Sequence, residues 1–235
     1  GTPQRAPDGK PLVRTVLFPA AEASMSDVWH VMGLKATGSD SYSLERLVVP
    51  QERSFVLDGA PDPSQSGVLY RFPITLVYAA GFAGVALGLA RGMLDALIDL
   101  AGSKVPQKQT GTLRDSPVIQ VQVAQAEAKL GSACMYLWRS LEDIQAALDA
   151  SGQPALSTDQ RMRVRLASTY GIHQAKEAAD IAWRAAGSTA IFEQDRFERR
   201  FRDIHAVTQQ IQARHTQLET VGQYLLGVTD EPGNY

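Results

Sequence analysis

The sequence lacks the features of disulfide-linked, nucleic-acid-binding and exported proteins. Cys134 is its only cysteine in 235 residues, so neither an internal disulfide nor a site with several cysteine ligands can form. The net charge of −2 gives no positive excess to attract nucleic acid or an anionic membrane. The first residues contain no apolar signal-peptide core. We therefore expect a cytoplasmic protein whose partners include neither nucleic acid nor a membrane.

Long apolar runs are also scarce. The exception is residues 73–90, PITLVYAAGFAGVALGLA, which are uncharged and reach the lower limit for a membrane span, about 18 residues. Arg91, Asp95 and Asp99 follow on the same expected helix, so a buried core helix is favoured over a span. The glycines of this run lie within a helix rather than between a strand and a helix. They are therefore expected to permit close helix packing and not to form a dinucleotide loop.

The first quarter of the chain carries short β-type runs between Leu12 and Phe55. The runs are LVRTVLF and YSLERLVV, the second of which is predicted to be a strand from Tyr42 to Pro50. His30 also falls in a predicted strand. About three strands are too few for a stable independent sheet. We therefore expect this region to be the end of a larger β domain.

Everything after residue 72 has helical patterns. The predicted helices run from Ile74 to Ala101, from Pro117 to about Ala150, from Ser157 onward, and from Asp195 to Gly227. The last two open with capping-box patterns, Ser157 with Gln160 and Asp195 with Glu198. The expected fold is α+β and mostly α. It has an incomplete β domain at 1–56, a linker at 57–72, an antiparallel four-helix bundle at 73–227 and a tail at 228–235.

The histidines do not form a metal site. His215 follows His205 by about three helical turns, but no Asp, Glu or Cys spacing makes a metal site of them, so we expect no metal. His173 falls on the predicted apolar face of the third helix with Met162, Leu166, Tyr170 and Ile181. It is expected to be a core residue with a satisfied hydrogen bond.

A charged cluster marks the start of the fourth predicted helix. Residues 197–212 read FERRFRDIHAVTQQIQ, which fits either an active-site wall or a solvated face. Arg202 and Asp203 project about 100° apart on a helix, so each needs a partner elsewhere. Arg199 and Asp203 are four residues apart and are able to pair on the surface.

The order of these features resembles the acyl-CoA dehydrogenase superfamily of flavoenzymes, which includes reduced-flavin-dependent monooxygenases. The resemblance rests on three stretches: WHVMGLKATGS at 29–39, LERLVVP at 44–50, and Phe201-Arg202-Asp203 before a long helical segment. It implies an N-terminal helical domain, a middle β domain and a C-terminal four-helix bundle. This chain matches the end of the β domain and the whole bundle.

The resemblance also implies a flavin held between the β domain and the bundle, FAD or alternatively FMN. It further implies a homodimer or homotetramer formed by bundle packing. The residues that it places at the cofactor are Thr37, Ser39, Gly187, Arg202 and Asp203. Gly187 matches the first glycine of the family's Gly-Gly-x-Gly-Tyr loop, but Ser188 to Ile191 depart from that pattern.

The proton-transfer positions of the family are altered in this sequence. The dehydrogenase glutamate falls on Ile211, and the histidine of the related monooxygenases falls on Gln210. Neither side chain titrates. His205 is the remaining group on this helix that titrates near neutral pH, and it is the candidate catalytic residue. Family arginines for the flavin diphosphate and the acyl-CoA fall near Gln107 and Ala79.

Three functions follow from this pattern. The first is oxidation of a small-molecule CoA thioester by a flavin enzyme of the acyl-CoA dehydrogenase type. The alternative is a reduced-flavin-dependent monooxygenase acting on an aromatic or sulfur substrate, which better suits the missing thioester arginine. The third is a non-catalytic helical fragment that oligomerises and binds no cofactor.

Overall fold

The computed structural model describes residues 4–5, 9, 11–56, 64 and 67–230. It divides into a β-rich unit, Gly1–His30 with Lys35–Ser66, and a helical unit, Val31–Leu34 with Gly67–Tyr235. Most of the predicted linker at 57–72 and most of the predicted tail at 228–235 lie outside the described residues.

Within its described residues, the β-rich unit contains two small antiparallel sheets. Strand β1 (Thr15–Val16) pairs with β4 (Ser54–Phe55), and β2 (Ser24–Ser26) pairs with β3 (Ser41–Ser43). Each strand has only two or three residues. Sheets of this size do not bury enough side chains to be stable alone.

Two strand predictions in this unit were wrong. Strand β3 ends at Ser43, and residues 44–50 are not a strand, because Arg46 has a left-handed φ of 49° that interrupts the extended chain. His30 also lies outside the strands. Just before it, the N–H groups of Val28 and Trp29 both donate to Asp40 Oδ1, at 3.0 and 3.1 Å, instead of to a neighbouring strand.

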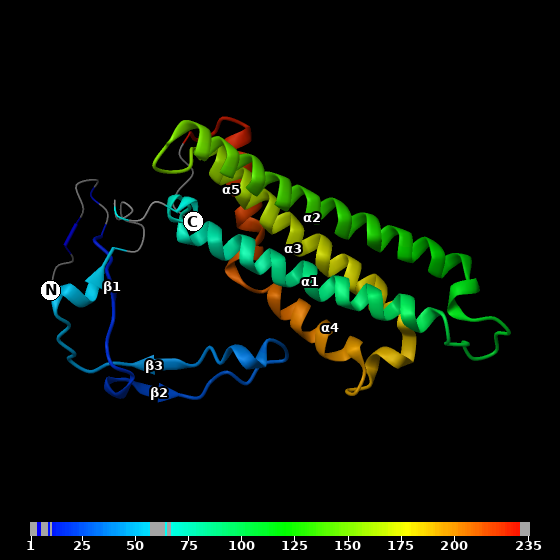
Figure 1. Cartoon of the computed structure of the whole chain (residues 1–235). Coiled ribbons are helices and arrows are strands. Elements are labelled where there is room, and N and C mark those ends of the chain that lie inside the picture. Colours follow the sequence, from blue (N-terminus) through cyan, green and yellow to red (C-terminus); the bar gives the residue numbers. More distant parts are fainter. Residues whose placement is uncertain (1–3, 6–8, 10, 57–63, 65–66, 231–235) are drawn as a thin grey trace. The chain divides into compact units, whose positions relative to one another are not determined.

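The helical unit is built from five α-helices, so the mostly helical fold is confirmed. These are α1 (Ile74–Ala101), α2 (Pro117–Ser151), α3 (Thr158–Ala186), α4 (Arg196–Val207) and α5 (His215–Leu225). The short 3₁₀ helices are η1 (Ala20–Glu22), η2 (Lys35–Thr37), η3 (Gln51–Arg53), η4 (Val68–Arg71), η5 (Leu113–Asp115), η6 (Gly187–Ile191) and η7 (Ile211–Ala213). The long helices α1, α2 and α3 lie side by side, and α4 packs on α1 and α3 (Figure 1).

Helix starts follow the sequence signals in part. Ser157 and Gln160 form the predicted capping box at the start of α3. The box predicted at Asp195 and Glu198 is not formed. The Asp195 carboxylate accepts the N–H of Arg196, while Glu198 pairs with Arg202 along α4.

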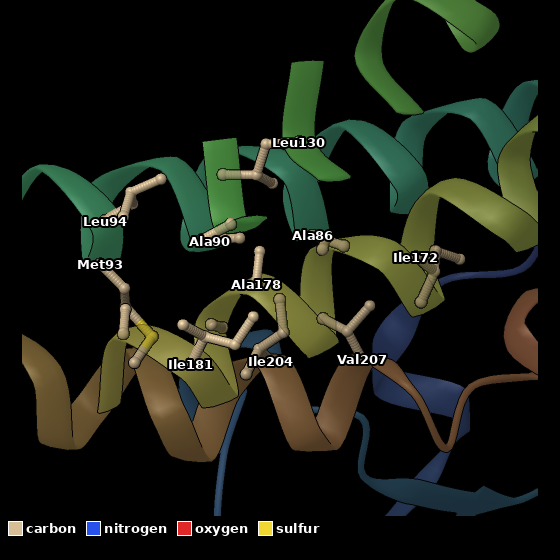
Figure 2. Close-up of a cluster of buried hydrophobic side chains, with 14 of the residues drawn as sticks. Ala86, Ala90, Met93, Leu94, Leu130, Ile172, Ala178, Ile181, Ile204 and Val207 are labelled. Atoms are coloured by element: carbon tan, nitrogen blue, oxygen red, sulfur yellow. The ribbon is translucent and has the colours of Figure 1, made fainter. Parts of the chain in front are cut away.

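The core of the bundle is rich in alanine on α1 and α3. Ala83, Ala86 and Ala90 of α1 are fully buried, and small side chains of this kind allow helix axes to approach closely. Figure 2 shows Ile204 and Val207 of α4 pointing toward this core. Among the described helices, α1 alone is long and apolar enough to cross a membrane, but its buried face is part of this core, as predicted.

Two predictions about helix faces were wrong. Tyr170 is 38% exposed, and the buried face of α3 instead runs through residues such as Val164 and Ala175. The glycines at 81, 84 and 88 do not sit at a close helix contact within the chain. A Cβ added at any of them would meet no atom within 4 Å.

Candidate functional site

The fourth predicted helix is broken in the middle. Helix α4 ends at Val207 and α5 begins at His215, so the prediction of one continuous helix from Asp195 to Gly227 was wrong. We call residues 208–214 the break loop. It contains the short turn η7, and Gln210 at its centre has an extended backbone with ψ of 151°. The family's two proton-transfer positions therefore lie in a loop and not on a helix face.

Side chains from α3 and α5 stabilise the break loop. Three successive carbonyl groups of the loop accept side-chain hydrogen bonds, and Ile211 O also accepts the backbone N–H of Arg214 at 3.3 Å. The pairs are Gln217 Nε2 to Ile211 O (3.2 Å), Thr169 Oγ1 to Gln212 O (2.9 Å) and His173 Nε2 to Ala213 O (2.8 Å). Because a carbonyl only accepts, His173 must carry its proton on Nε2.

Arg165 extends this set of contacts. Arg165, Thr169 and His173 are spaced four residues apart on one side of α3, and we call them the polar bed. Arg165 is only 2% exposed, and its Nη1 donates to the side-chain Oε1 of Gln212. Burial lowers the pKa of Arg165 to about 10, which still leaves the guanidinium charged at neutral pH.

The break loop gives Gln210 and Ile211 different environments. The Oε1 of Gln210 accepts the N–H of Gln212 at 2.6 Å. This contact holds the Gln210 amide by its oxygen and leaves the Nε2 group to donate. Ile211 is 50% exposed and carries no polar atom. The loop can therefore supply a neutral hydrogen-bond donor at position 210, but no base at either family position.

Arg202 and Asp203 hold the segment Met32–Leu34 against α4. Arg202 Nη1 donates to Met32 O at 2.5 Å, and Asp203 Oδ1 accepts the N–H of Leu34 at 2.7 Å. We call these contacts the clasp. The prediction that the two side chains find separate partners is confirmed, and the pairing of Asp203 with Arg199 is replaced by the contact with Leu34.

Gly33 makes the clasp sterically feasible. A Cβ at this position would lie 2.2 Å from the carbonyl oxygen of Arg202, far inside van der Waals contact. Arg202 also donates hydrogen bonds to the Glu198 carboxylate, and these raise the pKa of Arg202 above its ordinary value. In this structure the Arg-Asp pair therefore serves as an attachment point for backbone. A direct contact of either residue with flavin stays a prediction.

His205 has a carboxylate partner inside the bundle. Its Nε2 lies 3.0 Å from Asp180 Oδ1, and Asp180 Oδ2 is also 2.6 Å from Lys176 Nζ. The ring of Phe201 contacts the His205 imidazole, with centroids 4.3 Å apart. These contacts fix the ring against α3. A catalytic role for His205 stays a prediction.

Gly187 ends α3 in a conformation that favours glycine. Its φ of 61° and ψ of −142° lie in a region that side chains with a Cβ strongly disfavour. Beside it, Lys104 Nζ donates to Ala186 O at 2.6 Å and to Thr189 Oγ1 at 2.7 Å. The end of α3 thus combines exposed backbone with a fixed positive charge. Sequence reasoning had not identified Lys104.

The two site residues from the β-rich unit are placed only within that unit. Thr37 ends η2, and Ser39 follows Gly38, whose φ is 53°. The clasp on α4 and the contacts between the polar bed and the break loop, by contrast, both lie within the helical unit. Thr37 and Ser39 as flavin contacts stay a prediction.

An open groove of about 880 Å³ lies along α3 and the break loop. Tyr170, Lys176 and Arg214 line it together with the stacked rings of His173 and His215, whose centroids are 5.0 Å apart. None of the residues predicted as site residues lines this groove. Within the described part of the chain, no three His, Cys, Asp or Glu side chains are grouped to hold a metal ion.

The polar bed was missed by sequence reasoning, although a signal for it exists. Arg165, Thr169 and His173 recur every four residues on a helix whose other buried residues are mostly small or apolar. A buried polar stripe of this kind must have polar partners. The partner segment, however, is about 40 residues away in the sequence and was itself assigned to a helix.

Comparisons with known proteins identify the class to which this fold belongs. The family model described as acyl-CoA dehydrogenase, C-terminal domain, matches residues 80–215. The chain belongs to this family.

Relatives of known function are similar over nearly the whole chain. The indole-3-acetate monooxygenase of Pseudomonas putida is 30% identical over 233 residues, which cover 99% of this chain and 59% of that protein. The oxygenase component of the FADH(2)-dependent resorcinol hydroxylase of Rhizobium sp. is 27% identical, covering 97% of this chain and 59% of that protein. The chain therefore spans about three fifths of the length of these relatives.

Solved structures agree on the fold. XiaF from Streptomyces sp., in complex with FADH2 and glycerol, has a TM-score of 0.84 at 22% identity, covering 99% of this chain and 60% of its own. The 3-HSA hydroxylase from Rhodococcus sp. has a TM-score of 0.83 at 23% identity, covering 96% and 59%. At these identities the likeness shows the fold alone.

Proposed function

We propose that the chain is part of the oxygenase component of a reduced-flavin-dependent monooxygenase that acts on a small aromatic molecule. The observation that carries this proposal is the break loop, which offers an amide donor at Gln210 and an apolar side chain at Ile211. Removing the α proton of a CoA thioester requires a base, and none stands at either family position. The relatives described above are monooxygenases, which supports this alternative over thioester oxidation, the first interpretation of the sequence.

The end of α3 fits an anionic flavin. Gly187 is exposed and has a backbone conformation that favours glycine, while the Lys104 ammonium lies beside it. A fixed ammonium group is a suitable partner for flavin phosphate. We propose FADH2 or FMNH2 as the cofactor, with Thr37 and Ser39 as further contacts. The flavin supplies oxygen activation, and this chain's residues bind, orient and hydrogen-bond.

We further propose a cytoplasmic homodimer or homotetramer assembled through α2. An exposed stripe of small and apolar residues follows alternating three- and four-residue steps along this helix, as in helices that pack against a partner helix. The stripe consists of Val121, Ala124, Ala128, Gly131, Met135 and Trp138. Three of these side chains, Val121, Met135 and Trp138, are more than half exposed, which favours a covering partner.

Oxygen-transfer assays on the full-length protein test the proposed function. With reduced FMN or FAD, ¹⁸O₂ and a panel of phenols and indoles, we expect ¹⁸O in the hydroxylated product by mass spectrometry. Anaerobic bleaching of the oxidised flavin by an acyl-CoA, without oxygen transfer, would instead establish the dehydrogenase function. A protein that takes up neither flavin would be the non-catalytic oligomerisation module. Analytical ultracentrifugation tests the assembly separately. We expect Trp138→Glu to sediment as a smaller assembly than the parent.

A further inference from the structure

The contacts around Gln212 connect a buried arginine to the proposed donor. Arg165 on α3 donates to the side chain of Gln212, and the backbone N–H of Gln212 donates to the side chain of Gln210. Both contacts act on a residue that is 5% exposed, so solvent offers little competition for either. The direction of the Gln210 amide thus depends on where Gln212 is held.

Stability alone does not explain a buried arginine at this position. A charged side chain that is 2% exposed loses most of its hydration, and a well-packed apolar residue of similar volume is often as stabilising or more so. Thr169 already satisfies the carbonyl of Gln212 from the same helix. The hydrogen bond of Arg165 to Gln212 Oε1 fixes the Gln212 side chain, and with it the register of the break loop.

We propose that Arg165 is a positioning residue for the oxygenation site. Through Gln212 it holds the break loop in one conformation, in which Gln210 presents its Nε2 as a neutral donor where related monooxygenases have histidine. This inference rests on the proposed function for its catalytic half. Its structural half, the rigidity of the loop, stands on the contacts alone.

Hydrogen exchange tests the structural half without any cofactor. In the full-length protein, Arg165→Met should raise the exchange rate of amides in residues 208–216 about tenfold or more, while peptides from α1 and α2 stay unchanged. Arg165→Lys keeps the charge and should restore part of the protection. Arg163→Met is the matched control, because Arg163 lies on the same helix with a side chain that is 44% exposed and pairs only locally with Asp159.

Coupling tests the catalytic half. We define it as hydroxylated product formed per reduced flavin oxidised, a ratio that does not depend on how much of the protein is folded. Arg165→Met should lower this ratio about tenfold with little change in the dissociation constant for FMN, Arg165→Lys should recover part of it, and Arg163→Met should match the parent. Loss of folded protein with unchanged coupling would show that Arg165 is only structural, and the positioning role would be withdrawn.

A second variant keeps the test decisive if Arg165→Met does not fold. Thr169→Val removes the bond to Gln212 O with almost no change in shape, and it should loosen the same peptide and lower coupling in the same direction. If neither exchange nor coupling changes in Thr169→Val, the polar bed does not position the loop. If the parent protein transfers no oxygen at all, the proposed function fails, and the exchange result still decides whether Arg165 fixes the loop.

Discussion

Helix α4 and the break loop that follows it differ in how their backbones are satisfied. The backbone of α4 forms its own helical hydrogen bonds, which leaves Arg202 and Asp203 able to reach outward to Met32 and Leu34. The break loop has the opposite arrangement. The carbonyls of Gln212 and Ala213 accept side chains of α3, and the Gln210 side chain accepts a backbone N–H within the loop.

This difference separates two kinds of contribution to a site. The clasp is formed by side chains of α4, a helix whose backbone is already satisfied. Weakening the clasp therefore requires the loss of its own contacts. The break loop forms the short turn η7 by itself, and the polar bed adds hydrogen bonds that hold this turn against α3. We therefore expect substitutions at the clasp to change stability most, and substitutions at the loop to change catalysis most.

The largest effect is expected from Gly33→Ala. The added Cβ would lie 2.2 Å from Arg202 O and 2.8 Å from Asp203 N, and backbone atoms cannot give way as a flexible side chain can. We expect the free energy of unfolding to fall by about 3 kcal/mol or more, measured by urea unfolding.

Gly222→Ala is the control for this substitution. Gly222 lies within α5, and a Cβ there would meet no atom within 4 Å. Alanine should be neutral or stabilise the protein by up to about 1 kcal/mol. If the two variants behaved alike, Gly33 would not be packed on α4 and the clasp would be wrong.

A smaller loss is expected from Asp203→Leu. This change removes the acceptor of the Leu34 N–H and should lower the free energy of unfolding by about 1 to 3 kcal/mol. Asp203→Asn keeps an oxygen in the same place and should lose less than about 1 kcal/mol. Equal losses in the two variants would mean that charge, and not the hydrogen bond, holds the segment.

The sequence was sufficient for the elements whose signals are local. The predicted start of α2 at Pro117 and the capping box of α3 depend on neighbouring residues, and both are found. The break between α4 and α5 was not predictable in this way. The apolar residues Val207, Ile211 and Leu218 keep helical spacing across it, and the groups that interrupt the helix come from α3.

For the site, the sequence predicted which residues belong to it but not the contacts that they make. The resemblance located Arg202, Asp203, Gln210 and Ile211, because motif order is a property of the sequence. It could not show that the Arg-Asp pair clasps backbone or that Gln210 caps Gln212, because those contacts depend on residues that meet only after folding.

Gln210→His tests whether the loop supplies a neutral donor. An imidazole titrates near pH 6.5, so coupling in this variant should change by roughly threefold to tenfold between pH 5.5 and 8. The parent keeps every other histidine, so a transition that appears only in Gln210→His belongs to position 210, where the parent's amide does not titrate. Gln209→His places the same group at an exposed neighbour and should leave the parent's profile unchanged. If both variants showed the same transition, the proposal that position 210 in particular donates a hydrogen bond during the reaction would be wrong.

The smallest effect is expected from the titration of Arg165. Burial lowers its pKa to about 10 in the folded protein, below the value in the unfolded chain, so between the two values the unfolded state holds the proton that the folded state has released. Stability from this group must then rise with pH, by less than about 1.4 kcal/mol per pH unit. The unfolding free energy of the parent minus that of Arg165→Met should be flat below pH 9 and increase from pH 9 to 11. Lysines and tyrosines titrate equally in both proteins and cancel in this difference. A difference that stays flat to pH 11 would mean that the guanidinium remains fully charged beside Gln212, held by the loop more tightly than burial opposes it.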